Sequence, residues 1–97
     1  MADKLPKKDA EQFGILVTCF EKKENKKGLK TAEALLKKHP RHAETMAMKG
    51  LICNNMGDKT AAHELCSKAA EIDPNSHLVW HVYGLLHKQE QRYDEAK

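Results

Sequence analysis

Histidine and cysteine side chains are the first candidates for chemistry in this sequence. His77 and His81 lie four residues apart, and His63 lies three residues before Cys66. A zinc site needs three or four converging ligands, and the sequence contains no C-x-x-C or H-E-x-x-H motif. The two pairs also fall on different predicted helices, so surface histidines explain them better than a metal centre does. We therefore predict no bound metal and no other cofactor.

No catalytic constellation is visible among the other polar residues. The sequence has no glycine-rich phosphate loop, and no serine or cysteine stands beside a recognisable base. Trp80, Tyr83 and Leu86 could form an aromatic box for a ligand, but their helical spacing favours a place in the core. The chain is therefore predicted not to be an enzyme.

Basic residues form the one cluster in which a binding function competes with a structural explanation. Residues 1–42 carry eleven Lys and Arg against six Asp and Glu, whereas residues 43–97 carry six against eight. The cluster consists of Lys22, Lys23, Lys26, Lys27, Lys30, Lys37, Lys38 and Arg41. It could bind a phosphate backbone without reading bases, because no aromatic residue interleaves with it. It could equally be a solvated face that nearby glutamates partly neutralise, and the residues alone leave both interpretations open.

The elements that position these residues are organised around the 34 residues 43–76, which hold two helical patterns and a turn. In each pattern, residues of one helical face recur at the i, i+3, i+4 and i+7 spacing. Gly57 is expected to end the first helix in a left-handed conformation, and Asp58 to cap the second. Gly50 and Ala62 are small where the two helices must approach closely. This combination is the tetratricopeptide pattern.

The pattern recurs at its own period of 34 residues. The matching pairs are Cys19 and Cys53, Pro40 and Pro74, Gly50 and Gly84, and Ala62 and Ala96. We assign residues 1–8 to a polar lead-in, 9–42 to repeat one, 43–76 to repeat two and 77–97 to an incomplete repeat three. The predicted fold class is all-α, with tetratricopeptide-repeat hairpins stacked as a short right-handed solenoid.

The third repeat stops inside its predicted second helix, so the sequence is expected to belong to a longer protein. Trp80, Val82, Tyr83 and Leu86 would then lack the helix that should cover them. Because exposed apolar side chains favour association, we expect the isolated fragment to self-associate through this truncated end.

The first repeat is predicted to hold helices over residues 9–22 and about 26–38. Asp9 followed by Gln12 resembles a capping box that opens the first of them. Gly28 lies inside the second helix, and a glycine there is expected to mark a close helix contact.

The first helix of each repeat should line the concave surface of the solenoid. The predicted partner groove consists of Phe13, Val17, Phe20, Ala47, Leu51, Leu78, His81 and Leu85. Because most of these are apolar, the groove is expected to hold a helix or an extended chain of a partner. Ile15, Leu16 and Cys19 are expected to face the second helix instead.

The composition favours a cytoplasmic protein. Three cysteines are an odd number, and they lie on apolar stripes, which favours small core residues in a reducing compartment over disulfides. No apolar run is long enough to span a membrane, and the first residues lack the apolar segment of a signal peptide.

Three strings give the sequence a family resemblance. They are Thr45–Leu51 (TMAMKGL), Trp80–Leu86 (WHVYGLL) and Tyr93–Ala96 (YDEA). Together they resemble the large auxiliary subunits of NatA N-terminal acetyltransferases. The resemblance implies a non-catalytic scaffold that binds the catalytic subunit through later repeats and contacts the ribosome through a basic N-terminal region. It also makes the eight basic residues candidate contacts to ribosomal RNA phosphates. The alternative is a generic tetratricopeptide adaptor that binds a peptide or helix in its apolar groove.

Overall fold

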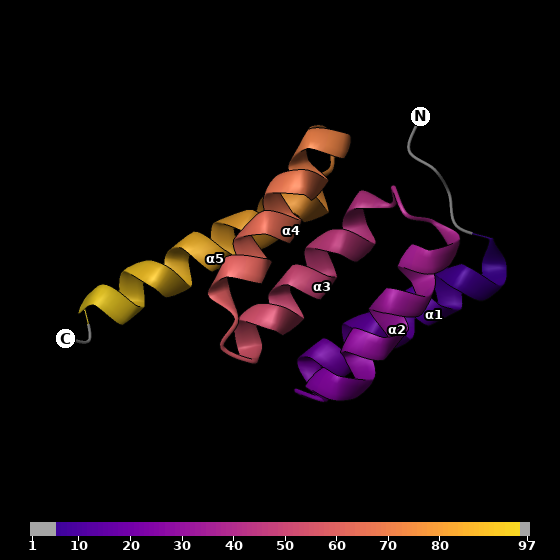
Figure 1. Cartoon of the computed structure of the whole chain (residues 1–97), viewed down its shortest axis with the longest axis horizontal. Coiled ribbons are helices and arrows are strands. Elements are labelled where there is room, and N and C mark those ends of the chain that lie inside the picture. Colours follow the sequence, from indigo (N-terminus) through magenta and orange to yellow (C-terminus); the bar gives the residue numbers. More distant parts are fainter. Residues whose placement is uncertain (1–5, 96–97) are drawn as a thin grey trace.

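The computed structural model describes the backbone of residues 6–95 and the side chains of residues 6–88. The described residues form five α-helices and no strand, which confirms the all-α prediction (Figure 1). The helices are α1 (Lys7–Glu21), α2 (Asn25–Lys38), α3 (Ala43–Asn55), α4 (Lys59–Ile72) and α5 (His77–Glu95). No described helix is long and apolar enough to cross a membrane.

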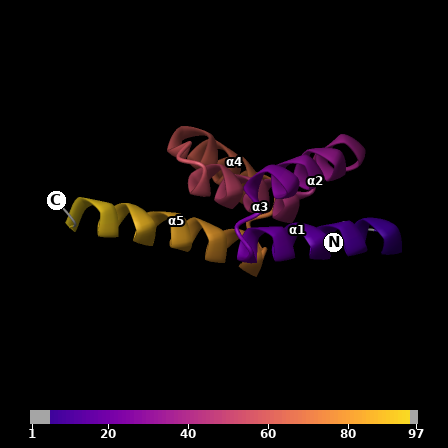
Figure 2. The ribbon, with the colours of Figure 1, turned by 90° about the horizontal axis from the view of Figure 1, so that it is seen from below.

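Helix α3 is the centre of the arrangement and contacts each of the other four helices. Seen from below, α1 and α5 follow one edge of the molecule, whereas α2 and α4 lie on the opposite side and diverge (Figure 2). No Cα atoms of α2 and α4 come within 8 Å of each other. The backbones of the two outer helices are therefore joined through α3, which packs against both.

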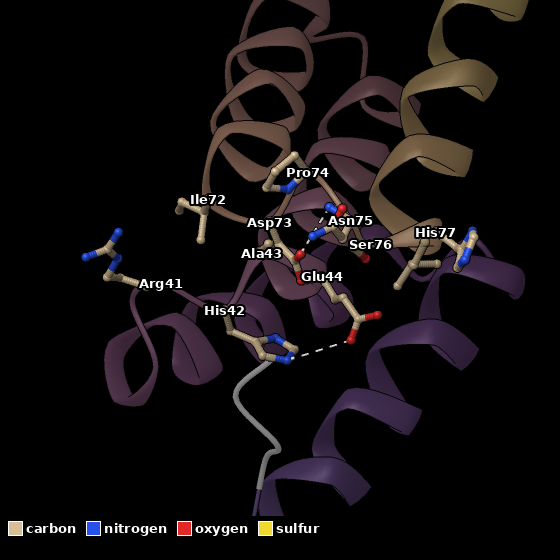
Figure 3. Close-up of a pocket in the computed structure, with 11 residues that line it drawn as sticks. Arg41, His42, Ala43, Glu44, Ile72, Asp73, Pro74, Asn75, Ser76 and His77 are labelled. Atoms are coloured by element: carbon tan, nitrogen blue, oxygen red, sulfur yellow. Dashed lines mark hydrogen bonds and ion pairs between the residues drawn. The ribbon is translucent and has the colours of Figure 1, made fainter. Parts of the chain in front are cut away.

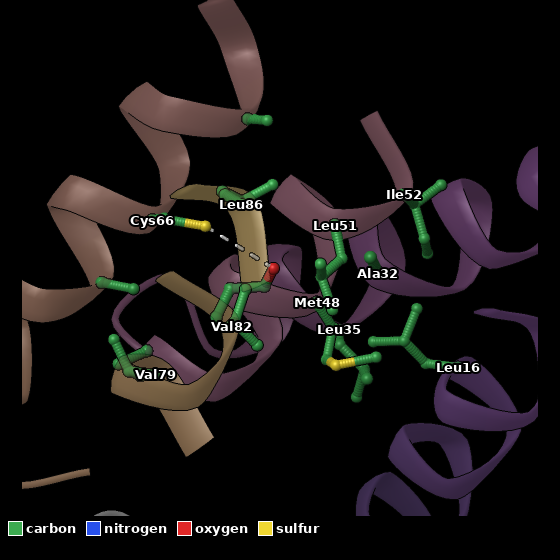
Figure 4. Close-up of a cluster of buried hydrophobic side chains, with 14 residues drawn as sticks. Leu16, Ala32, Leu35, Met48, Leu51, Ile52, Cys66, Val79, Val82 and Leu86 are labelled. Atoms are coloured by element: carbon green, nitrogen blue, oxygen red, sulfur yellow. Dashed lines mark hydrogen bonds between the residues drawn. The ribbon is translucent and has the colours of Figure 1, made fainter. Parts of the chain in front are cut away.

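The composition of α3 explains its central position. Its buried residues occupy more than half of the helix circumference, and the remaining side carries the half-buried Met46, Lys49 and Cys53, as expected for a helix with neighbours on most sides. The core that surrounds it is contributed by all five helices (Figure 4). Its largest fully buried apolar side chains are Leu16, Leu35, Ile52, Val79, Val82 and Leu86.

Two glycines allow the close helix approaches that the sequence predicts. A Cβ atom on Gly28 would lie 2.8 Å from Ile52 Cδ1, and one on Gly50 would lie 2.9 Å from Cys66 Sγ and 3.1 Å from the carbonyl oxygen of Ala62. Ala62 itself is fully buried. These contacts confirm the prediction that small residues at these positions bring α2 and α4 close to α3.

The turn between α3 and α4 also follows the prediction. Gly57 has a φ of 92°, which is the left-handed conformation that glycine adopts without steric penalty. The Asp58 side chain accepts a hydrogen bond from the backbone N–H of Ala61 and so caps α4.

The start of α1 differs from the prediction. The helix begins at Lys7 after Pro6, and no side-chain hydrogen bond caps it. Asp9 lies within the first turn and is buried, so the predicted capping box with Gln12 is wrong. Proline suits the residue before a helix because its fixed φ is compatible with entry and it has no N–H to satisfy.

Helix α5 also differs from the prediction because it runs unbroken to Glu95, and its C-terminal half extends beyond the other helices (Figure 1). The 34-residue period would place the turn glycine at position 91, which is Gln91. Residues 88–92 contain neither glycine nor proline, and they are good helix formers, so nothing local interrupts the helix. Ala96, the predicted counterpart of Ala62, lies outside the described residues.

Candidate interaction surfaces

Eight exposed basic residues form a surface that we call the basic face. They are Lys22, Lys23, Lys26, Lys27, Lys30, Lys37, Lys38 and Arg41. The first four surround the turn between α1 and α2, while the last three lie at or just beyond the other end of α2. A 14-residue helix is about 20 Å long. The structure therefore divides the cluster into two groups, with Lys30 between them.

Few of these charges are neutralised within the chain. Lys38 lies 3.6 Å from the Asp9 carboxylate, but the other seven form no ion pair within residues 6–88. Glu33, which could have neutralised the cluster, lies 4.0 Å from Lys49 of α3 instead. The basic face thus presents its charge to solvent.

Comparison with the second hairpin shows that this charge is specific to the first. On α2, the exposed stripe consists of Lys26, Lys30, Glu33 and Lys37. The residues 34 positions later on α4 are Thr60, Glu64, Ser67 and Glu71, which are also exposed. The same surface position is therefore basic on α2 and acidic on α4. A phosphate backbone would therefore be attracted to the first hairpin more strongly than to the second, although α4 also carries the exposed Lys59 and Lys68 outside this stripe.

The sequence did not predict an ion cluster between the start of α1 and the end of α2. Asp9 is buried, and its Oδ2 atom accepts a hydrogen bond of 2.6 Å from Nε2 of His39. This hydrogen bond, reinforced by Lys38, lowers the pKa of the Asp9 carboxyl below its usual value against the opposing effect of desolvation. No local signal links two residues that are 30 positions apart. The cluster joins the two ends of the first hairpin.

The predicted partner groove is wrong at its centre. Ala47 is fully buried and Leu51 is 2% exposed, so neither can contact a partner. Both lie on α3, which has α1 on one side and α5 on the other. In a stack of repeats, a first helix with neighbours on both sides buries a face in the core. The first helix of a terminal repeat leaves the same face exposed.

The remaining groove residues lie on the terminal helices and are accessible to different degrees. Phe13, Val17, Phe20, Leu78 and Leu85 are half-buried and pack against the core, and only His81 is exposed. Ile15 is 40% exposed, so the expectation that it would face the second helix is also wrong.

Trp80 is the largest departure from the predicted core. It is 52% exposed, whereas Val82 and Leu86, which were expected to be uncovered, are almost fully buried. Trp80 stacks on Tyr83 at 6.1 Å between ring centroids, and Tyr83 stacks on His87 at 4.8 Å. A Cβ on the adjacent Gly84 would have no atom within 4 Å. At the other end of this stack His87 contacts His63 of α4 at 5.8 Å between ring centroids, so only the part of this side around Trp80 and Gly84 is open.

A pocket of about 600 Å³ lies where the loops before α3 and α5 meet (Figure 3). His42 caps α3 by accepting from the backbone N–H of Thr45, and Ser76 accepts from Val79 near the start of α5. Arg41 and Glu44 both line the pocket. Its mixed charge and its satisfied helix ends give no preference for an anion.

The cysteines are free thiols. Burial raises the pKa of Cys66 to about 11 and also raises that of the half-buried Cys53, so both favour the neutral thiol. No group of three or more His, Cys, Asp or Glu in the described part of the chain could hold a metal ion.

The fold and these surfaces can be compared with known proteins. The family described as "Psidin, N-terminal TPR repeats region" matches residues 16–97. The chain is 48% identical over 96 residues to the N-terminal acetyltransferase A complex auxiliary subunit NAA15 of Arabidopsis thaliana, covering 99% of this chain and 11% of that protein. It is 44% identical over 94 residues to N-alpha-acetyltransferase 16, NatA auxiliary subunit, of Homo sapiens, covering 95% of this chain and 11% of that protein.

A solved structure shows the same arrangement of helices. In the structure of Naa15/Naa10 bound to HypK-THB, one chain matches with a TM-score of 0.84 and 43% sequence identity, covering 92% of this chain and 14% of the matched chain. The chain thus spans about a tenth of the length of these relatives. At this identity and TM-score, the matched region shares both its fold and its ancestry with the chain.

Proposed function

The chain belongs to the family of Psidin-type N-terminal tetratricopeptide-repeat regions, and we propose that it is part of a non-catalytic scaffold of an N-terminal acetyltransferase complex, because it is homologous to NatA auxiliary subunits. Its proposed partners are a catalytic subunit of the Naa10 type, bound mainly by repeats outside these residues, and the ribosome. The proposed location is the cytoplasm.

The observation that carries this proposal is the 48% identity to the plant NAA15 subunit over almost the whole chain. Identity at this level, together with a shared arrangement of helices, supports a shared role for the region. The alternative of a peptide-binding groove receives less support, because Ala47 and Leu51 at its centre are buried.

The ribosome contact is proposed for the basic face. Seven of its eight side chains form no ion pair in the described region, and the matching stripe on α4 is acidic. Phosphate contacts are made by exposed lysines and need no base-reading residues. The basic face would therefore bind ribosomal RNA through its backbone and without sequence preference.

The first experiment tests the scaffold role with the full-length product of the gene. Purified alone, the protein should transfer no acetyl group from acetyl-CoA to a peptide that begins with serine or alanine. Co-expressed with the Naa10-type subunit of the same organism, it should co-purify with that subunit and the complex should be active. Acetylation by the protein alone would overturn the scaffold proposal.

The second experiment tests the ribosome contact by co-sedimentation. The Lys26→Glu and Lys27→Glu double variant should release ribosomes at lower salt than the wild type, because it places two negative charges on the basic face. The matched control is Lys68→Glu with Lys88→Glu, which changes the net charge equally at exposed positions on α4 and α5. If both variants dissociate from ribosomes at the same salt concentration, or if both dissociate as the wild type does, the basic face is only solvated.

A further inference from the structure

The turn between α1 and α2 contains an unusual backbone conformation. Lys23 has a φ of 61°, and it is the only residue other than glycine with a positive φ in the described chain. In this left-handed region a side chain crowds the neighbouring carbonyl oxygen, so residues with a Cβ atom are uncommon there. A lysine at this position therefore makes the folded chain less stable than a glycine would.

The second hairpin shows how the same turn is formed without strain. The residue 34 positions after Lys23 is Gly57, which has a φ of 92°. In both turns the residue before it has φ of −85° and ψ of 0°. The two turns therefore place a left-handed residue at the same point, and only the first uses a residue with a side chain.

The surroundings of Lys23 indicate why a lysine is kept there. The segment Glu21–Lys27 carries four lysines and two glutamates, and all six are exposed without an ion pair in the described structure. The backbone N–H groups of Lys23 and Glu24 already donate to the carbonyl oxygens of Phe20 and Cys19. They are not available to an anion, so at the left-handed residue itself only the side chain can bind one.

We infer that the Lys23 side chain is the central phosphate contact of the basic face, kept at a strained backbone position for its charge. The inference rests on the proposed ribosome contact and names the part of the surface that approaches the RNA backbone most closely. The left-handed residue lies at the tip of the hairpin, between Lys22 at the end of α1 and the Lys26–Lys27 pair at the start of α2. A phosphate bound at this tip would therefore have lysines of the same turn on both sides of Lys23 in the chain.

The test uses the full-length protein, a mixed-sequence RNA duplex of about 20 base pairs as the probe, and fluorescence anisotropy across a salt titration. Each phosphate contact contributes about 0.9 to the slope of log affinity against log salt, so loss of one should weaken binding about eightfold at 0.1 M salt. Lys23→Gln should show this loss, with little change in melting temperature, because it keeps the strain and removes the charge. Lys23→Arg keeps both charge and strain and should bind as the wild type does.

Lys23→Gly separates stability from binding. It should raise the melting temperature slightly while weakening RNA binding as Lys23→Gln does, because glycine relieves the strain and removes the charge; the shift in melting temperature is small because the full-length protein is large. Gly57→Lys should do the reverse in the second hairpin, lowering the melting temperature without strengthening RNA binding beyond the nonspecific gain of one charge. Lys88→Gln, which changes the same net charge on α5, measures that nonspecific effect.

The outcomes distinguish this inference from the proposal on which it rests. If Lys26→Glu with Lys27→Glu weakens RNA binding but Lys23→Gln has no larger effect than Lys88→Gln, the role of Lys23 is refuted and the basic face stands. If none of these variants changes binding, both are refuted. A Lys23→Gly variant that binds RNA like the wild type would likewise overturn the role of Lys23.

Discussion

Gly50 and Gly84 occupy the same position of the 34-residue period but have opposite surroundings. Replacing a glycine by alanine inside a helix gains about 1 kcal/mol of intrinsic helix stability. At Gly84 a Cβ atom meets nothing within 4 Å, so Gly84→Ala should raise the free energy of unfolding by about this amount. At Gly50 the same atom would lie 2.9 Å from Cys66 Sγ and 3.1 Å from the backbone oxygen of Ala62.

Overpacking of this kind typically costs about 1–3 kcal/mol, which should cancel or exceed the gain in helix stability. Gly50→Ala should therefore lower the free energy of unfolding by about 0–2 kcal/mol. The two variants should differ by about 1–3 kcal/mol in urea unfolding followed by circular dichroism, since each carries the same chemical change. If Gly50→Ala stabilises the chain as much as Gly84→Ala does, the close approach of α4 to Gly50 is refuted.

Three further predictions follow from the ion cluster, the thiols and the uncovered side of α5. Asp9→Asn should lower the urea midpoint at pH 7. The difference from the wild type should disappear as the pH falls through the lowered pKa of Asp9, because protonation removes the same ion pair from the wild type. An equal difference in urea midpoint at pH 7 and pH 2 would contradict this. Cys66 should react with a thiol reagent at pH 8 only as fast as the chain unfolds, because its buried thiol has a pKa of about 11; native-state labelling of Cys66 at the rate of a free thiol would contradict its burial. The 97-residue chain should self-associate at tens of micromolar, as measured by sedimentation. Trp80→Ala should weaken the self-association, because Trp80 is 52% exposed beside the open Gly84. A wild-type chain that sediments as a monomer at that concentration would refute the prediction.

Sequence periodicity was sufficient for the local features of this fold. The positions of α2, α3 and α4, the left-handed Gly57 and the cap at Asp58 depend on residues within a few positions of one another. The close approaches at Gly28 and Gly50 were also predicted, but Gly84 at the same repeat position as Gly50 makes no such contact, so a small residue inside a helix was not a sufficient signal. The exposure of the basic face followed from its charge, since unpaired lysines are not buried.

Only the tertiary structure decided which residues the neighbouring helices cover. Ala47 and Leu51 are buried because α3 has a helix on each side, while Trp80 is exposed because α5 has neighbours on one side only. Equivalent positions of a repeat have the same local sequence pattern but different numbers of neighbours, and burial depends on the neighbours. The hydrogen bond between Asp9 and His39 likewise arises because the hairpin brings its two ends together.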